Sequence, residues 1–398
     1  MNEQLPNWSE FLETMKPAQE LIALALTPDD EQFKAELCQQ FILNIAFGYF
    51  ILFNSTPDHP DWAPMPGTIF LAQPNPDDVY LQAPLRGDRT YRVSGERGTT
   101  LLMVFVIKQG MAGMIDPPHP LVGFYDADEL TIDANGCFEF ILSSERPAGY
   151  KGDWLYLDPK GKVIQARIRA YDWENERDGR LAIECLDGPL LKPMPDKAEI
   201  AQRMNVIAKF VDRHSRLWLN YHRDLRARQE VNTLALTGFT EFGGLGEQGA
   251  GQRMQHYWQG IFEFKQGEAL ILETEIPKEV KFWNIQLNDL LFNTIDYVNR
   301  QGSLNGRQAR LDKDGRFRAV LSTEDPGIHN WLDTDGYHMG VVVGRWVRSD
   351  SNPVPTLKRV PLADIRKHLP PDTPTISAEE RGETVRRRRR AWQMRRRW

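Results

Sequence analysis

The amino-acid sequence predicts an α+β protein with two β-sandwich or jelly-roll-like units and with N-terminal, central and C-terminal helices. Three observations lead to this prediction. Apolar residues recur at helical spacing in separate blocks, two other blocks alternate as strands do, and one strand-turn-strand pattern occurs twice. The 398 residues, 41% of them hydrophobic, suffice for two or three domains that bury their cores without disulfides or a metal.

Residues 1–56 are predicted to be helical. Apolar residues follow helical spacing from Phe11 to Leu24 and again from Phe33 to Ile45, and Thr27-Pro28-Asp29 provides a break and a new N-cap. The first residues are polar and acidic, without a signal-peptide pattern, and no run of about 18 apolar residues occurs. We therefore expect a cytoplasmic protein without a membrane span.

The rest of the chain divides by composition. Residues 57–188 contain short alternating runs and are predicted as the first β-rich unit. Residues 189–250 hold a proline-rich linker, a long apolar helical stripe and a glycine-rich loop, which lacks the strand-turn-helix context of a dinucleotide site. Residues 251–350 are predicted as the second β-rich unit, and residues 351–398 as a proline-rich linker and an arginine-rich helix.

The two β-rich units resemble each other. Residues 130–147 match residues 309–326 at one constant offset, with an Asp-x-x-Gly turn between two strands and a proline after the second strand. Trp154 then corresponds to Trp331, and residues 85–91 align more weakly with residues 276–282. We interpret the match as an internal duplication; the alternative is chance similarity of turn chemistry.

Charge is distributed unevenly along the chain. The formal net charge is -6, but residues 381–398 contain nine Arg and one Glu, a local +8, which leaves -14 for the rest (-6 minus 8). This balance argues against nucleic-acid binding by the body of the protein. The arginine-rich helix, which follows a capping box at residues 377–380, could attach to RNA or acidic lipid. We favour its packing on the chain's own acidic surface or on a neighbouring subunit in a homo-oligomer.

Residues 283–288 alternate apolar and polar, so Asn284, Gln286 and Asn288 share one face of a strand. The weaker alignment pairs this strand with residues 92–96 of the first unit, whose polar face has the pattern of ordinary solvent exposure. Buried amides need hydrogen-bond partners or a ligand. The strand is therefore either the wall of a binding site or an exposed edge strand.

A second polar group occupies residues 297–345 of the second unit, and several of its members have no equivalent in the first unit. The mixture of carboxylate, imidazole, amides, arginines and an aromatic ring is suited to a small ligand. The predicted catalytic residues are Asp333, His329 and Tyr297. The predicted substrate-binding residues are Asn284, Gln286, Asn288, Asn299, Arg300, Asn330, Trp331 and Arg345. The alternative is structural: turn caps, a core tryptophan, and an ion pair of Arg345 with Asp325 or Asp333.

No metal or other cofactor is predicted. The eight histidines form no metal-ligand pattern, the three cysteines are far apart, and neither a nucleophile elbow nor a phosphate-binding loop occurs. The three separated cysteines favour a reducing compartment.

The run from Trp283 to Trp346 resembles the family called domain of unknown function 1214, and Asp-Pro-Gly-Ile-His-Asn-Trp-Leu-Asp at 325–333 is its most specific part. Residues 75–98 are similar to the segment that accompanies this domain in longer members. The resemblance implies a β-sandwich or jelly-roll domain paired with a mixed domain, usually in bacteria. Members often occur in organisms that degrade hydrophobic small molecules, and the resemblance implies no catalytic residues.

The leading functional hypothesis is a cofactor-independent enzyme of the lyase or hydrolase type. Its substrate would be a hydrophobic small molecule with a few polar groups, such as a lipid, terpenoid, steroid or aromatic. The predicted carboxylate or imidazole would transfer protons, the amides would hold oxygens, and an arginine would orient a charge. The alternatives are a non-catalytic ligand- or carbohydrate-binding β-sandwich and an interaction protein that uses the arginine-rich helix.

Overall fold

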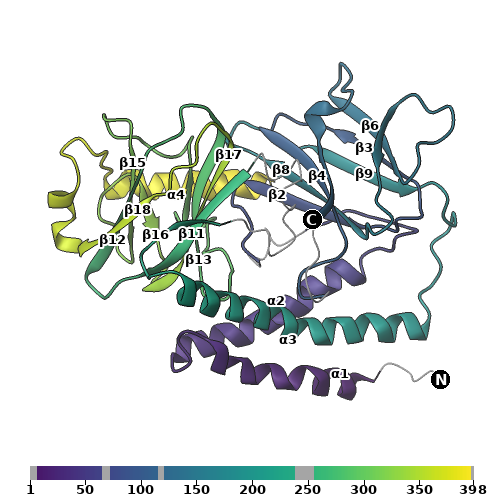
Figure 1. Ribbon diagram of the computed structural model, residues 1–398, viewed down its shortest axis with the longest axis horizontal. Helices are drawn as coiled ribbons and strands as arrows, with labels where there is room; N and C mark the ends of the chain where they lie inside the picture. The colour runs from purple at the N-terminus through teal and green to yellow at the C-terminus, as the bar shows by residue number, and fades with distance from the viewer. Residues whose placement is uncertain (1–6, 65–71, 115–120, 238–254, 396–398) are drawn as a thin grey trace.

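The structure is a computed structural model that describes residues 7–64, 72–114, 121–237 and 255–395 (Figure 1). The predicted glycine-rich loop at residues 243–251 lies outside these ranges. Four β-sheets form two sandwich-like units, with helices before, between and after them. The predicted α+β class is confirmed.

Each unit pairs a five-stranded sheet with a four-stranded sheet. In the first unit their strand orders are β1-β2-β8-β4-β5 and β7-β6-β3-β9, and in the second β10-β11-β17-β13-β14 and β16-β15-β12-β18. The strands of the first unit are β1 (Ala63–Pro64), β2 (Asp78–Pro84), β3 (Tyr91–Glu96), β4 (Leu102–Lys108), β5 (Leu121–Asp126), β6 (Cys137–Ser143), β7 (Asp153–Tyr156), β8 (Val163–Arg169) and β9 (Arg180–Cys185). Those of the second are β10 (Ala235–Thr237), β11 (Gln255–Glu263), β12 (Glu268–Thr274), β13 (Val280–Asn288), β14 (Ser303–Asn305), β15 (Phe317–Ser322), β16 (Trp331–Asp333), β17 (Met339–Ser349) and β18 (Thr356–Pro361).

The strand order supports the internal duplication. Every strand of the first unit has a counterpart nine strands later in the same place, and β6–β7 and β15–β16 are the parallel pairs of the described sheets. The turn glycines Gly136 and Gly315 both have φ of +79°. Trp154 and Trp331 each donate from Nε1 to a serine Oγ at 3.0 Å. The repeated sequence pattern therefore encodes a repeated structure.

The weaker upstream alignment is wrong by one strand. Tyr91 opens β3, whose counterpart is β12, whereas Phe282 lies in β13, whose counterpart is β4. Short strands of similar alternation look alike in sequence, so a match without a turn signal can slip to the neighbouring strand. The first-unit equivalents of the β13 amides are therefore Val104, Val106 and Lys108 on β4, instead of residues of β3.

Side chains alternate between the two faces of each five-stranded sheet, and this alternation determines which residues face away from the sandwich core. Val79, Leu81 and Ala83 of β2 point into the first sandwich, and Tyr80 and Gln82 between them point to the opposite face. In the second unit Trp283, Ile285 and Leu287 likewise fill the sandwich core. The opposite faces carry the polar residues, and hydrogen bonds between residues 74–77 and β13 join the two units there.

The N-terminal and central helices lie along one side of both units (Figure 1). They are α1 (Trp8–Met15), a 3-10 helix (Lys16–Leu24), α2 (Glu31–Leu52) and α3 (Lys197–Arg228). Asp30 caps α2 by accepting from two backbone N–H groups, so the N-cap lies one residue after the predicted Thr27-Pro28-Asp29 break. By length and composition α2 could cross a membrane, but the core helix of a soluble protein and a signal sequence meet the same criterion.

The arginine-rich tail forms α4 (Ala378–Arg395), which follows β18 and a 3-10 helix (Leu362–His368). The predicted capping box is present: Ser377 N–H donates to Glu380 and Glu380 N–H to Ser377 Oγ, at 2.8 and 3.2 Å. Arg381, Arg388 and Arg395 recur every seven residues and are buried. The helix packs on the chain's own two units, as the favoured interpretation of its charge predicts.

Candidate functional site

The structure divides the predicted site residues into two separate groups. Asn284, Gln286, Asn288 and Arg345 lie on the inter-unit face of the second unit's five-stranded sheet. The others lie around β15, β16 and α4.

Most residues of the β15–β16 group have structural partners. The amide of Asn330 bonds to backbone atoms of Arg310 and Arg318 at 2.6–2.9 Å. Trp331 donates to the Ser322 hydroxyl, and Arg381 stacks over its ring. Asp333 accepts from Arg300 at 2.9 Å. This part of the site matches the structural alternative.

The remaining predicted residues are also held by neighbours. His329 Nδ1 lies 3.3 Å from Asn330, and burial lowers the pKa of the imidazole. Tyr297 is fully buried against Trp392, and burial raises the pKa of its phenol well above the ordinary value. Asn299 donates to Asp296 at 2.7 Å. Asp333, His329 and Tyr297 each contact other neighbours, and their catalytic roles remain predictions.

The β13 amides are buried in the middle of a sheet, between β14 and β17, so the edge-strand interpretation is wrong. Asn284 donates to Asn75 at 2.6 Å and to Asp77 at 2.8 Å. Gln286 donates to the Pro74 carbonyl, to Asn288 and to Thr294 at 2.9–3.2 Å. These amides connect the second unit to residues 74–77 of the first.

Arg345 is fixed by amides. It donates to Asn284 at 3.3 Å and to Gln286 at 2.5 Å, and its guanidinium lies 5.1 Å from the centre of the Tyr257 ring. The ion pair with Asp325 or Asp333 that the structural alternative predicts is not formed; within the described residues, those carboxylates pair with Arg381 and Arg300.

The duplication places the same three residue types at this face of both units. Tyr80 and Gln82 lie on β2, and Tyr257 and Gln259 lie at the equivalent places on β11. Directly opposite the tyrosines, the neighbouring strands carry Arg167 and Arg345. Arg167 lies 5.9 Å from the Tyr80 ring centre. We call these six residues the paired Tyr-Arg-Gln site.

The two halves of the paired site act on each other electrostatically. Burial raises the pKa of Tyr257, but the guanidinium groups of Arg345, Arg167 and Arg169 outweigh burial and bring it below the ordinary value. Burial raises the pKa of Tyr80, and Asp78 adds to the rise against the opposing effect of Arg167 and Arg345. Both arginines thus act on both phenols, and the hydrogen bond of 2.9 Å from Arg169 of β8 to Gln255 of β11 joins the two halves.

The arginines of the paired site lack acidic partners. Arg167 donates to Gln165 at 3.0 Å, and within the described ranges no carboxylate lies at ion-pair distance from Arg167 or Arg345. By contrast, Arg169 holds Asp78 through two hydrogen bonds of 2.5 and 2.8 Å. The site therefore holds more positive than negative charge.

Three buried glutamines at this inter-unit region have unsatisfied amide atoms. Among the residues that the structure describes, Oε1 of Gln82, Oε1 of Gln259 and both amide atoms of Gln73 lack hydrogen-bond partners. An unsatisfied buried polar atom costs about 1–3 kcal/mol. Ala72 and Gln73 also have φ of 62° and 54°, a strained region for residues other than glycine. Polar groups aimed at no protein partner are typical of a ligand site.

Apolar side chains adjoin both halves of the paired site. Tyr80 packs in a cluster with Phe47 and Phe210, and Tyr257 in a cluster with Trp218 and Val343. Helices α2 and α3 contribute to these clusters, so the helical layer covers the site. The arrangement combines apolar contact area with a few directed polar groups, as small-molecule sites do.

Sequence reasoning missed Tyr80, Gln82, Arg167, Tyr257 and Gln259. A signal was present, because Tyr-x-Gln occurs at residues 80–82 and 257–259 with an offset of 177, the same as that between Trp154 and Trp331. The paired Tyr-Arg-Gln site consists of duplicated polar residues, whereas the residues ranked highest from the sequence were unduplicated ones.

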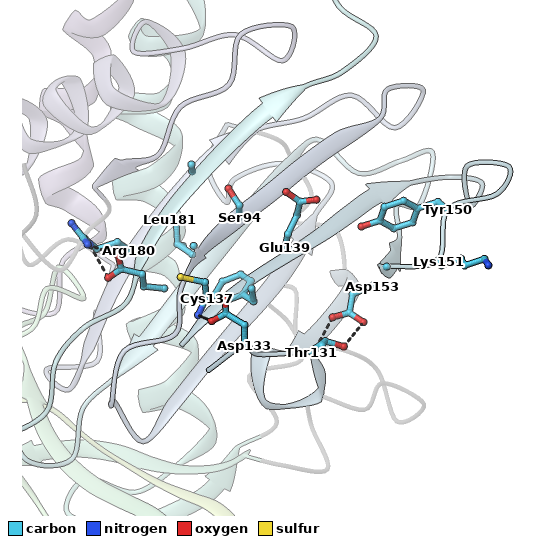
Figure 2. Close-up of a pocket in the computed structure, with 15 residues that line it drawn as sticks. Ser94, Thr131, Asp133, Cys137, Glu139, Tyr150, Lys151, Asp153, Arg180 and Leu181 are labelled. Atoms are coloured by element: carbon cyan, nitrogen blue, oxygen red, sulfur yellow. Dashed lines mark hydrogen bonds and ion pairs between the residues drawn. The ribbon is translucent and has the colours of Figure 1, made fainter. Parts of the chain in front are cut away.

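A separate surface groove crosses the outer face of β3, β6, β7 and β9 (Figure 2). It has a volume of about 960 Å³, and none of the predicted site residues lines it. Its charged groups are satisfied locally: Arg180 pairs with Glu96, and Asp153 accepts from Thr131. Across the described part of the chain, no group of three or more His, Cys, Asp or Glu side chains is arranged to hold a metal.

Comparisons with known proteins place the chain among uncharacterized ones. The family model described as "Protein of unknown function (DUF1214)" matches residues 266–343. A crystal structure of an uncharacterized protein from Burkholderia cenocepacia is 26% identical, with a TM-score of 0.80, and the alignment covers 89% of this chain and 97% of that one. A protein from Vibrio parahaemolyticus is 14% identical, with a TM-score of 0.45, over 81% of this chain and 96% of that one. No curated protein matches.

The resemblance noted from residues 283–346 is confirmed, because the matching family model spans β12 to β17 of the second unit. Residues 266–343 match the model of the family described as a protein of unknown function (DUF1214), and the two-unit fold is similar to that of the Burkholderia cenocepacia protein.

Proposed function

We propose that this chain is a cofactor-independent enzyme that performs proton-transfer chemistry, of the lyase or hydrolase type, on a hydrophobic small molecule bound at the paired Tyr-Arg-Gln site. One observation carries the proposal. On duplicated strands each unit sets a tyrosine opposite an arginine, a hydrogen bond of 2.9 Å from Arg169 to Gln255 joins the two halves, and the buried Oε1 atoms of Gln82 and Gln259 lack hydrogen-bond partners among the described residues.

The pKa values of the two phenols are shifted in opposite directions, which suits Tyr257 and Tyr80 to opposite roles in proton transfer. Groups whose environments push their pKa values apart are the candidates for base and acid. Tyr257, with a lowered pKa, is the candidate base, and Tyr80, with a raised pKa, is the candidate acid. In an elimination, Tyr257 would take a proton from one carbon while Tyr80 gives a proton to the oxygen leaving the next. The C–H and C–O bonds break, and a C=C bond forms.

The proposal predicts that Tyr257→Phe abolishes turnover. The purified full chain is incubated with a panel of lipids, terpenoids, steroids and aromatics, and products are identified by mass spectrometry. Because a positioned acid or base contributes about 10²–10⁴-fold, the variant should lose at least about 100-fold in kcat/KM. Tyr49→Phe, at an exposed tyrosine of α2, is the matched control.

Equal turnover by the wild type, Tyr257→Phe and Tyr80→Phe would overturn the proposal. Activity that survives both changes but is lost in His329→Gln or Asp333→Asn would assign the chemistry to the β15–β16 group instead. Circular dichroism of each variant separates loss of chemistry from loss of fold.

A second candidate function is non-catalytic ligand binding. The observation in its favour is that the Asn75 backbone N–H donates to the Tyr80 oxygen at 2.9 Å, which gives that phenol a structural role. An apolar compound that co-purifies with the chain, stays unchanged and remains bound by Tyr80→Phe would support this alternative.

A further inference from the structure

We propose that the ligand of the paired Tyr-Arg-Gln site carries a carboxylate, which binds between Arg167 and Arg345. This inference rests on the proposed function, because it concerns the same site, and it names the class of ligand. Its basis is the charge and the hydrogen-bond inventory of the inter-unit region.

Buried charges in proteins are normally paired, because moving an ion out of water carries a large desolvation cost. Arg345 is 3% exposed, yet its hydrogen-bond acceptors are the amides of Asn284 and Gln286 and the phenol of Tyr257, none of which is a carboxylate. Arg167 is half-buried, and its acceptor is the neutral amide of Gln165. Neutral acceptors orient a guanidinium without cancelling its charge, so both arginines remain available to an anion.

The nearby carboxylates do not fill this role. Asp78 is engaged by Arg169, with both of its oxygens accepting. Asp77 accepts from Asn284, Asn305 and Trp173, and burial raises the pKa of this carboxyl. The region thus has one ion pair and two further arginines, an excess that one or two anionic oxygens would balance.

The shape of the polar groups favours a carboxylate. A planar guanidinium binds a planar carboxylate through two parallel hydrogen bonds. The amide contacts of Arg345 hold one such plane in place, and the unsatisfied Gln82 and Gln259 oxygens can accept from a hydroxyl or amide elsewhere on the ligand. The apolar clusters around Tyr80 and Tyr257 suit a hydrocarbon body attached to the carboxylate.

The test uses octanoate and 4-phenylbutyrate as probes, each with its primary amide as the neutral control. Binding to the full-length wild type is followed by thermal shift and by calorimetry at low salt. We expect at least one acid to bind and to raise Tm, with at least about tenfold tighter binding than its amide. Arg345→Lys and Arg167→Gln should each weaken the acid at least about tenfold, whereas Arg390→Gln on the exposed side of α4 should not.

Several outcomes overturn the inference. They are equal binding of acid and amide, tighter binding of octyl phosphate than of octanoate, or unchanged affinity in both arginine variants. The wild-type comparison of acid with amide stands even if a variant fails to fold. If neutral probes bind and Tyr257→Phe loses turnover, the carboxylate assignment fails and the proposed function stands. If acids bind as expected and Tyr257→Phe keeps full turnover, the function fails and the ligand class stands.

Discussion

At the scale of single residues, the duplicated tyrosines Tyr80 and Tyr257 differ in the residue two positions before them. Asp78 lies two residues before Tyr80, and the equivalent residue before Tyr257 is Gln255. Burial is the main cause of the raised pKa of Tyr80 and Asp78 adds to it, whereas the three arginines lower the pKa of Tyr257, which has an uncharged amide at the equivalent position. A duplicated pair thereby acquires two different proton affinities without any change in the tyrosines or arginines themselves.

Lys108, at the end of β4, is expected to make stability depend on pH. Burial lowers the pKa of its ammonium group to about 7, and Arg167 adds to the shift. Between about pH 7 and 10 the unfolded chain binds the proton and the folded chain does not, so the free energy of unfolding rises with pH in this window.

The measurement is Tm at pH 7 and pH 9. We expect a higher Tm at pH 9 for the wild type and a smaller rise for Lys108→Met, which removes the buried ammonium. Lys151→Met, at an exposed residue of the first unit, is the control. An identical pH dependence of Tm in the wild type and in Lys108→Met would contradict the prediction.

At the scale of elements, α4 joins the two units through its buried arginines. Arg381 pairs with Asp325 and Arg388 donates to the Tyr297 carbonyl, both in the second unit. Arg395 pairs with Asp178 of the first unit at 2.9–3.3 Å. The spacing of seven residues returns each arginine to the same helix face, so the helix bridges the units.

Removing one buried arginine of α4 should destabilise the protein strongly. Arg395→Met leaves Asp178, whose side chain is 1% exposed, without this cation, and the expected loss is about 3–5 kcal/mol in the free energy of unfolding. Arg390→Met on the exposed face should change it by less than about 0.5 kcal/mol. Denaturant unfolding measures both. Equal effects of the two changes would show that α4 does not act through its buried face.

At the scale of the whole molecule, duplication accounts for the architecture and for the site. Two units with identical strand order are joined by hydrogen bonds such as Arg169 to Gln255 and Asn284 to Asn75, and helices α2 and α3 add apolar side chains beside the paired Tyr-Arg-Gln site. The site needs both units, since each supplies one tyrosine, one arginine and one glutamine.

The duplication predicts matched effects of matched substitutions. Gly136 and Gly315 have the same φ, and an added Cβ meets no atom within 4 Å at either position. The cost of Gly136→Ala and of Gly315→Ala is therefore backbone strain alone, about 1–2 kcal/mol each. Denaturant unfolding should give equal losses within about 0.5 kcal/mol. A difference above about 1 kcal/mol would show that the two turns are not energetically equivalent.

The fold could be predicted from local sequence patterns. The Asp-x-x-Gly turns, the capping box at Ser377 and the helical stripes of α2 and α3 act over a few residues, so they can be recognised in one sequence. Edge strands such as β10, with three residues, and β18, after a proline-rich stretch, carry little alternation, and both lie outside the range 251–350 predicted for the second unit.

The sequence by itself determined the α+β class, the two related units, the family resemblance and the polar face of β13. Only the tertiary structure decided that this face meets the first unit, that Asn330 and Trp331 have hydrogen-bond partners within the chain, and that Arg345 lies beside Tyr257, Asn284 and Gln286. Turn chemistry and periodicity depend on neighbours in sequence. The site depends on how two units, distant in sequence, pack against each other, and burial and charge there arise only from that packing.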